Sequence, residues 1–300
     1  QANGYQTAIF GKWHLVSHPT GFDFWEIQDG QGLYYNPIFI GMDGKKFRRH
    51  GYNSDIVADR ALWWLKEKRD SKKPFMLMVH FKGVHSEWHP ALRHANMYDN
   101  VKFPLPETFY DDYSTRGSAA KNQEMRIDNH MENYRLVLDN PPKSMTPEEK
   151  EIWRQKFAAK DKAFFEGNPS GRELVERKYQ RYMQNYCATL AGVDENVGRI
   201  LEQFGAASPY GQGKGKSGAG GGRAGGNRAR RTGVHRAVCA AFGSGAKAFG
   251  RINKNKINEE KKKNRGITCF FLFRLHIHRG NMERSERNEH VAAIYCFTGP

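Results

Sequence analysis

The sequence predicts an α/β fold for residues 1–205 and no packed structure for a tail, residues 206–300. Two observations predict the fold. An amphipathic helical pattern passes directly into a short apolar run of strand length, which is the order of an α/β crossover. Two long stretches of helix-forming residues then follow it. A third observation limits the folded part, because Gly-rich and basic sequence takes over after Gly205.

The first helix is expected from about residue 55 to residue 69. Asn53 and Ser54 are typical of a helix start. The apolar residues that follow at helical spacing share one face: Ile56, Val57, Ala61, Trp64 and Leu65. The sequence Lys72-Lys-Pro74 ends this helix, since proline cannot continue it. The apolar run Phe75–Phe81 then has the length of a buried parallel strand.

Two further helices are expected from Glu148 to about Phe165 and from Glu173 to Phe204. The second carries apolar and aromatic residues at helical spacing: Tyr179, Tyr182, Met183, Tyr186, Leu190, Val193, Val197, Ile200 and Leu201. Proline-containing stretches at 102–106 and 139–142 are typical of surface loops. We interpret the aromatic residues of the helices as packing residues and give them no catalytic role.

The charge is uneven along the chain, whose net charge is +16. Residues 206–300 hold 19 Lys and Arg against 5 Glu and no Asp, so they carry +14 and leave +2 for residues 1–205. The net positive charge of the chain therefore gives no information about the binding partners of residues 1–205. Cys187 is the single cysteine of residues 1–205, so the sequence predicts neither a disulfide framework nor a zinc site there.

The tail is expected to be disordered or read out of frame, because its glycine-rich composition supplies too little apolar burial to offset chain ordering. Its clustered arginines allow nonspecific RNA binding as an alternative, but we expect no nucleic-acid partner. The sequence has no run of about 18 apolar residues, so no membrane span is expected. Because Gln1 leads directly into a dense motif, we expect the chain to be a fragment.

That motif is Gly4-Tyr-Gln-Thr-Ala-Ile-Phe-Gly-Lys-Trp-His-Leu15. It resembles the second sulfatase signature, G-Y-x-T-A-x-x-G-K-W-H-L-G, with Val16 in place of the last Gly. Further segments resemble the same family in the same order: Pro19–Asp23, Gly30–Pro37, Lys73–Phe75 with the strand that leads to His85, Trp88, Pro90 and Arg93, and the long helix from Tyr179. The resemblance covers about residues 1–205, and Val84 and Glu87 stand where the family often has proline.

The resemblance implies a fold and an activity. The fold would be an incomplete alkaline-phosphatase-like sandwich, a mixed sheet between helices with unpaired sheet edges. The activity would be hydrolysis of sulfate esters of small molecules or carbohydrates, with calcium and a formylglycine nucleophile as cofactors, in a secreted, lysosomal or periplasmic enzyme. The C/S-x-P-S-R motif that supplies the nucleophile does not occur in these 300 residues, and no metal ligands are assigned. We therefore expect this chain by itself to be inactive.

Three site residues follow from the resemblance. It implies that Lys12 binds the sulfate, that His14 lies beside the nucleophile's hydroxyl, and that His85 donates to the ester oxygen. The residue types suit these roles, because an ammonium attracts an oxyanion and an imidazole passes protons near neutral pH. A structural role is the alternative for each of them, and His80, His89 and His94 are weaker candidates.

Two other functions stay open at this point. The same fold handles phosphate and phosphonate esters, which are similar tetrahedral oxyanions. The chain could also be a non-catalytic protein derived from a sulfatase, with a basic tail that binds nucleic acid.

Overall fold

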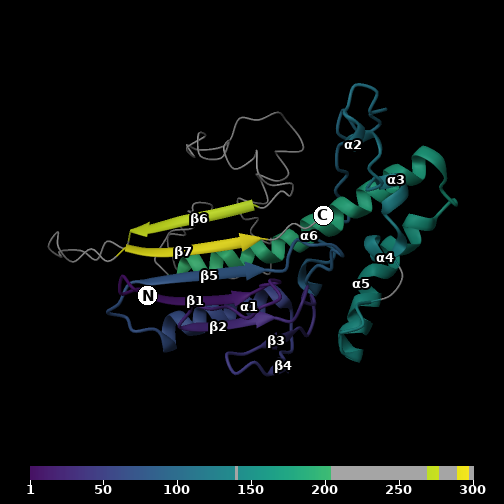
Figure 1. Cartoon of the computed structure of the whole chain (residues 1–300). Helices are drawn as coiled ribbons and strands as arrows, with labels where there is room; N and C mark the ends of the chain where they lie inside the picture. The colour runs from purple at the N-terminus through teal and green to yellow at the C-terminus, as the bar shows by residue number, and fades with distance from the viewer. Residues whose placement is uncertain (139–140, 204–268, 277–288, 297–300) are drawn as a thin grey trace, which may run out of the picture.

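The computed structural model describes residues 1–138, 141–203, 269–276 and 289–296. Their strands are β1 (Gln6–Gly11), β2 (Phe24–Gln28), β3 (Ile38–Ile40), β4 (Lys46–Arg48), β5 (Phe75–Phe81), β6 (Cys269–His276) and β7 (Glu289–Cys296). They form one seven-stranded sheet in the order β4-β3-β2-β1-β5-β7-β6. The four strands β2, β1, β5 and β7 run parallel, whereas β3, β4 and β6 pair antiparallel, so the sheet is mixed (Figure 1).

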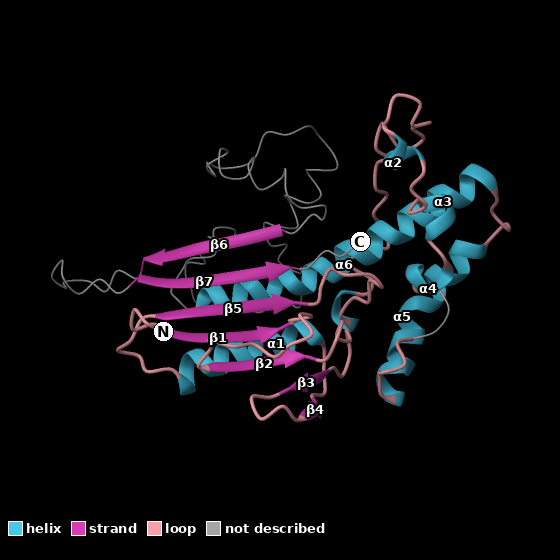
Figure 2. Cartoon of the chain, viewed as in Figure 1, coloured by secondary structure: helices cyan, strands magenta, loops and turns pink. Residues whose placement is uncertain are grey.

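Two helices cover one face of the sheet. Helix α1 (Asn53–Trp63) continues into a π-helical turn over Trp64–Lys68, and α6 (Gly171–Glu202) runs beside it (Figure 2). Alternate residues of β1 and β5 point into this interface, as the two-residue period of a strand requires. The resulting core includes Ala8, Phe10, Val57, Ala58, Ala61, Phe75, Leu77, Val79, Phe81, Val193 and Ile200. On the other face, Ile9 of β1 joins residues of β2 and β3 in a smaller cluster: Ile9, Trp25, Ile27 and Ile40.

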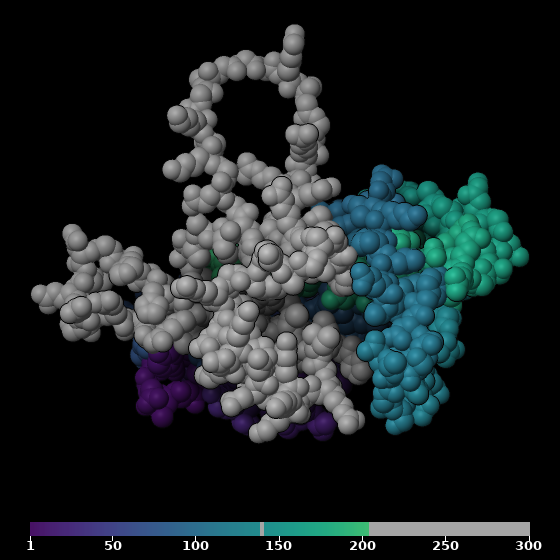
Figure 3. All heavy atoms as spheres, turned by 90° about the horizontal axis from the view of Figure 1, so that it is seen from above, coloured from purple at the N-terminus to yellow at the C-terminus, as the bar shows by residue number. Residues whose placement is uncertain are grey.

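The remaining helices lie beyond the carboxyl ends of the parallel strands (Figure 1). They are α2 (Ser118–Lys121), α3 (Ile127–His130), α4 (Asn133–Leu136) and α5 (Pro147–Phe165). Figure 3 shows them gathered on one side of the molecule, away from the N-terminal strands. Helix α5 begins with a capping box, in which Thr146 Oγ1 accepts from the backbone of Glu149 at 3.2 Å and the Glu149 carboxylate accepts from the backbone of Thr146 at 2.8 Å.

The predicted elements are confirmed with small changes of boundary. Strand Phe75–Phe81 is β5, and the three expected helices are α1, α5 and α6. Helix α1 begins at Asn53, but its cap position is Tyr52, which makes no side-chain capping bond. The loop at 102–106 is confirmed, whereas residues 139–140 of the second expected loop lie outside the described residues. No helix in the described part of the chain is long and apolar enough to cross a membrane.

The tail differs from expectation where the structure describes it. Residues 269–276 and 289–296 are the strands β6 and β7, and β7 pairs in parallel with β5 from Met76↔Val291 to Phe81↔Cys296. The expectation of unpaired sheet edges is therefore wrong for β5. The rest of residues 206–300 lies outside the described residues. The glycine-rich stretch dominated the composition of the tail and concealed two short segments with the residue content of strands.

Candidate functional site

The carboxyl ends of β1 and β5 bring two lysines to one edge of the sheet. The strands are parallel neighbours, with Gly11 opposite His80, and the backbone N–H of Lys12 donates to the His80 carbonyl at 2.8 Å. Lys12 follows β1 directly and Lys82 follows β5 directly. Because carboxyl ends of adjacent parallel strands meet, two residues that are 70 positions apart in sequence share this edge.

Gly11 makes the close approach of these strand ends possible. Its φ is +101°, and a Cβ atom there would lie 1.9 Å from the His80 carbonyl oxygen. Only glycine adopts this conformation without strain and leaves that space. The glycine of the motif therefore fixes the position at which the chain turns into Lys12.

The Lys12 side chain is buried, with 4% of its surface exposed. Its Nζ donates to Gln31 Oε1 at 2.6 Å, and burial lowers its pKa below the ordinary value. The Gln31 amide nitrogen in turn lies 3.2 Å from Nε2 and 3.3 Å from Nδ1 of the exposed His14 ring. The structure thus brings Lys12 and His14 together through Gln31. Sequence reasoning matched the Gly30–Pro37 segment but gave Gln31 no role.

His85 lies three residues beyond Lys82 and is half-buried. Its Nδ1 contacts the carbonyl of Ser86, and its own carbonyl accepts from the Tyr34 hydroxyl at 2.5 Å. Burial lowers the pKa of His85; the Ser86 carbonyl partly offsets this, and the positive charges of Lys12, Lys82 and His14 lower it further. Since a carbonyl only accepts, Nδ1 carries the proton and Nε2 of the neutral ring is an acceptor.

Lys82 is a member of this site that sequence reasoning missed. It is 6% exposed, its Nζ donates to the Gln31 carbonyl at 3.3 Å, and Nζ lies 4.9 Å from the centre of the Tyr34 ring. Burial, followed by the positive charge of Lys12, lowers the pKa of Lys82 to about 8, while Glu87 acts in the opposite direction. A lysine after a strand usually indicates a solvated surface residue, so only the fold reveals this one.

The three weaker histidine candidates have surroundings that indicate structural and not catalytic roles. His80 lies in β5, and its Nδ1 is 3.0 Å from the Lys12 carbonyl, so it joins the ends of β1 and β5. Burial lowers the pKa of His80 to about 4 and that of His89 to about 3, which keeps both rings neutral. His94 Nε2 lies 3.4 Å from the Glu195 carboxylate, which pairs with Arg93, and burial lowers the pKa of His94. These rings support the elements around the site.

The donor set at the strand ends does not suit calcium. Calcium takes carboxylate, carbonyl and water oxygens. The side chains gathered here are two ammonium groups, two imidazoles and an amide. Among the described residues, no group of three or more His, Cys, Asp or Glu is placed to hold a metal ion.

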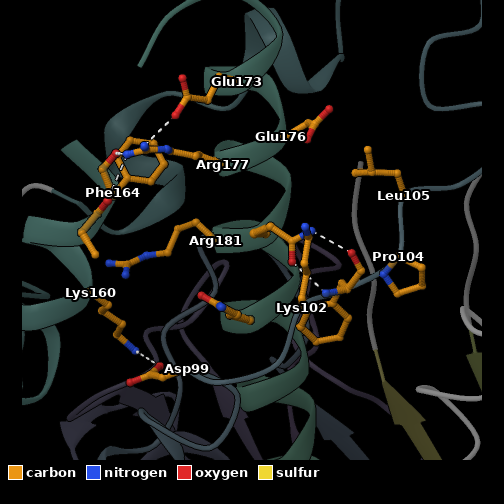
Figure 4. A pocket seen from close by; sticks show the side chains of 14 residues that line it. Asp99, Lys102, Pro104, Leu105, Lys160, Phe164, Glu173, Glu176, Arg177 and Arg181 are labelled. Carbon is orange, nitrogen blue, oxygen red and sulfur yellow. Dashed lines mark hydrogen bonds and ion pairs between the residues drawn. The ribbon is translucent and has the colours of Figure 1, made fainter. Parts of the chain in front are cut away.

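A separate hollow between α5, α6 and residues 99–105 does not belong to this site (Figure 4). It lies on the N-terminal half of α6, whereas the sheet packs against the C-terminal half at Val193 and Ile200. Most of its charged groups already have partners: Lys160 pairs with Asp99 at 3.1 Å, Arg177 pairs with Glu173 at 2.6 Å, and Arg181 pairs with Asp161. This hollow therefore offers no cluster of unengaged charges.

A family model described as Sulfatase matches residues 1–209. The chain belongs to the sulfatase family. This sulfatase chain is 41% identical over 219 residues to the N-acetylglucosamine-6-O-sulfatase of Bacteroides thetaiotaomicron, and the match covers 67% of the chain and 39% of that protein.

The sulfatase chain is also similar to a solved structure of a protein in complex with its substrate, D-glucosamine-2-N,6-O-disulfate. The TM-score is 0.64 with 39% identity, over 69% of this chain and 46% of that one. This likeness confirms the expected fold class, the alkaline-phosphatase-like sandwich with a mixed sheet flanked by helices. The chain spans less than half the length of either relative.

Proposed function

We propose that residues 1–205 supply the lysine and histidine part of a site that hydrolyses sulfate esters of carbohydrates. The observation that carries this proposal is the Lys12–Gln31–His14 cluster at the ends of β1 and β5, with His85 beside it. Family membership supports the reaction class. A carbohydrate substrate is supported by the relatives, one an N-acetylglucosamine-6-O-sulfatase and the other bound to a disulfated glucosamine.

The proposed roles follow from charge and geometry. Lys12 Nζ binds a sulfate oxygen, because a buried ammonium that is already held by one hydrogen bond attracts an oxyanion strongly. The Gln31 amide orients the His14 ring, which would lie beside the attacking hydroxyl. Gln31 therefore sets the spacing of both groups.

His85 is proposed as the acid toward the leaving ester oxygen. Its lowered pKa favours the neutral ring, whose Nε2 has no proton to give. A bound sulfate brings negative charge, which raises the pKa of a neighbouring imidazole and favours a second proton on Nε2. Binding of the substrate would thus protonate His85, the group that acts as the acid when the ester is cleaved.

We further propose that the 300-residue chain does not turn over a sulfate ester by itself. It lacks the C/S-x-P-S-R motif of the formylglycine nucleophile, and its site does not suit calcium. Removing one group of a catalytic unit commonly costs orders of magnitude in rate, so binding without turnover is the expected behaviour.

Isothermal titration calorimetry and a sulfate-release assay test this together. The chain should bind D-glucosamine 6-O-sulfate more tightly than D-glucosamine, release no sulfate, and lose the preference in Lys12→Met. Tighter binding of D-glucosamine 6-phosphate would favour a phosphate ester instead. Equal binding of D-glucosamine and its 6-O-sulfate would contradict the proposed site.

A further inference from the structure

We propose that Lys82 is a second sulfate-binding residue, so that one sulfate group is held between the ammonium groups of Lys12 and Lys82. This inference rests on the proposed function and adds to it a specificity-determining residue. Its basis is the placement of two buried lysines on one acceptor residue: Gln31 accepts from Lys12 through Oε1 at 2.6 Å and from Lys82 through its backbone carbonyl at 3.3 Å.

The surroundings of Lys82 do not balance its charge. No carboxylate of the described residues lies within 4.0 Å of its Nζ, which contacts the Gln31 carbonyl oxygen and the face of the Tyr34 ring. An ammonium has three donors, so one hydrogen bond leaves capacity for a ligand. Burying an uncompensated charge is costly, which makes a bound anion a favourable partner.

Lys160 shows how a buried lysine with a structural role differs. Burial lowers its pKa to about 8, as for Lys82. Its Nζ, however, pairs with the Asp99 carboxylate at 3.1 Å and donates to the Ala95 carbonyl at 2.5 Å. Lys160 is therefore neutralised inside the protein. Lys82 is more deeply buried and has no carboxylate within 4.0 Å, which distinguishes a ligand-binding cation from a structural one.

The backbone holds Lys82 in place. It follows β5 directly, and the next residue, Gly83, packs so closely on α6 that a Cβ atom would lie 2.8 Å from Val193 Cγ2. The start of the loop that carries Lys82 and His85 thus packs closely against α6. A cation held this way needs little reorganisation when an anion arrives, and preorganised charge binds an oxyanion better than mobile charge.

A pH titration of sulfate binding should report Lys82. The charged and titratable groups that face it are Lys12, His85, Glu87, His89 and the Tyr34 hydroxyl. Because the pKa of Lys82 is about 8, the ammonium form is present below pH 8 and is lost as the pH rises through it. Sulfate affinity should fall about tenfold per pH unit above 8. An arginine at position 82 stays charged across this range, so the Lys82→Arg variant assigns the decrease to Lys82 and not to His85.

The test is calorimetric titration of the 300-residue chain with sodium sulfate at constant ionic strength, with circular dichroism to check the fold. Lys82→Met should weaken sulfate binding at least tenfold, and Lys82→Arg should restore much of it and remove the decrease above pH 8. Lys102→Met, which removes an exposed lysine, is the matched control and should change affinity less than twofold.

Unchanged sulfate affinity in Lys82→Met would overturn the proposal, and loss of binding in Lys12→Met alone would leave the proposed function standing. If Lys82→Met does not fold, NMR of the lysine side chains in the unaltered chain decides. Saturating sulfate should then raise the titration midpoint of Lys82, and an unmoved midpoint would reject the assignment.

Discussion

Gly11→Ala should destabilise the protein more than any ordinary glycine substitution in a loop. The new Cβ would meet the His80 carbonyl oxygen at 1.9 Å, and the residue sits at a φ of +101°. The unfavourable φ costs roughly 1–2 kcal/mol for a residue with a Cβ. Moving β1 away from β5 adds roughly 1–3 kcal/mol of overpacking and weakens the hydrogen bond from Lys12 to His80. The two contributions together give an expected loss of about 2–5 kcal/mol.

Gly21→Ala separates the two contributions. Gly21 also has a positive φ, +76°, but a Cβ atom there would meet nothing within 4 Å. Its loss of stability should therefore be about 1–2 kcal/mol, from the backbone conformation alone. Urea unfolding of both variants, followed by circular dichroism, measures the difference between them. With a typical dependence of roughly 2 kcal/mol per molar urea, the midpoint of Gly11→Ala should lie roughly 1 M below that of Gly21→Ala.

A second consequence concerns the site. If Gly11 fixes the approach of the two strand ends, Gly11→Ala should also weaken sulfate binding, because Lys12 is the next residue. Equal stability of the Gly11→Ala and Gly21→Ala variants would refute this reasoning. It would mean that the strand ends adapt to the extra atom and that the close approach does not determine the position of Lys12.

Two other substitutions test the packing around the sheet. Glu26→Gln removes the buried carboxylate that accepts from Arg49 at 2.6 Å and Arg60 at 3.0 Å, and should cost about 1–3 kcal/mol in urea unfolding because the two arginines are only partly exposed. An effect below about 0.5 kcal/mol would show that water replaces the carboxylate. Thr146→Ala removes the capping box of α5 and should cost about 1 kcal/mol. Thr20→Ala, at an exposed position with no capping role, should stay within about 0.5 kcal/mol, and equal losses in the two Thr variants would exclude a capping effect.

Local sequence patterns predicted the helices and the strand whose apolar residues recur periodically or form a continuous run. Strand Phe75–Phe81 and helix α6 carry enough apolar residues to be read without knowledge of their partners. The short strands β3 and β4 escaped prediction, because three residues carry no period. Strand β7 escaped because its pairing depends on β5, more than 200 positions away in the sequence, and β6 joins the described sheet through β7.

The residues of the candidate site also divide into those that the sequence could predict and those that it could not. Lys12, His14 and His85 could be predicted because they fall within motifs that resemble a known family. Gln31 and Lys82 could not, since the functions proposed for them depend on the register of β1 and β5 and on burial that the fold creates. An amide and a lysine have ordinary surface roles in most sequences. Their placement, and not their residue type, makes them candidates.

The most direct test of the central claim is the activity of a chimera. Residues 1–205 would replace the matching segment of the Bacteroides thetaiotaomicron N-acetylglucosamine-6-O-sulfatase, and sulfate release from N-acetylglucosamine 6-O-sulfate would be measured. The chimera should release sulfate, and its Lys12→Met variant should lose at least a hundredfold in kcat/KM. A folded chimera without activity, or one in which Lys12→Met has no effect, would contradict the claim that these residues form a working part of a sulfate ester hydrolase site.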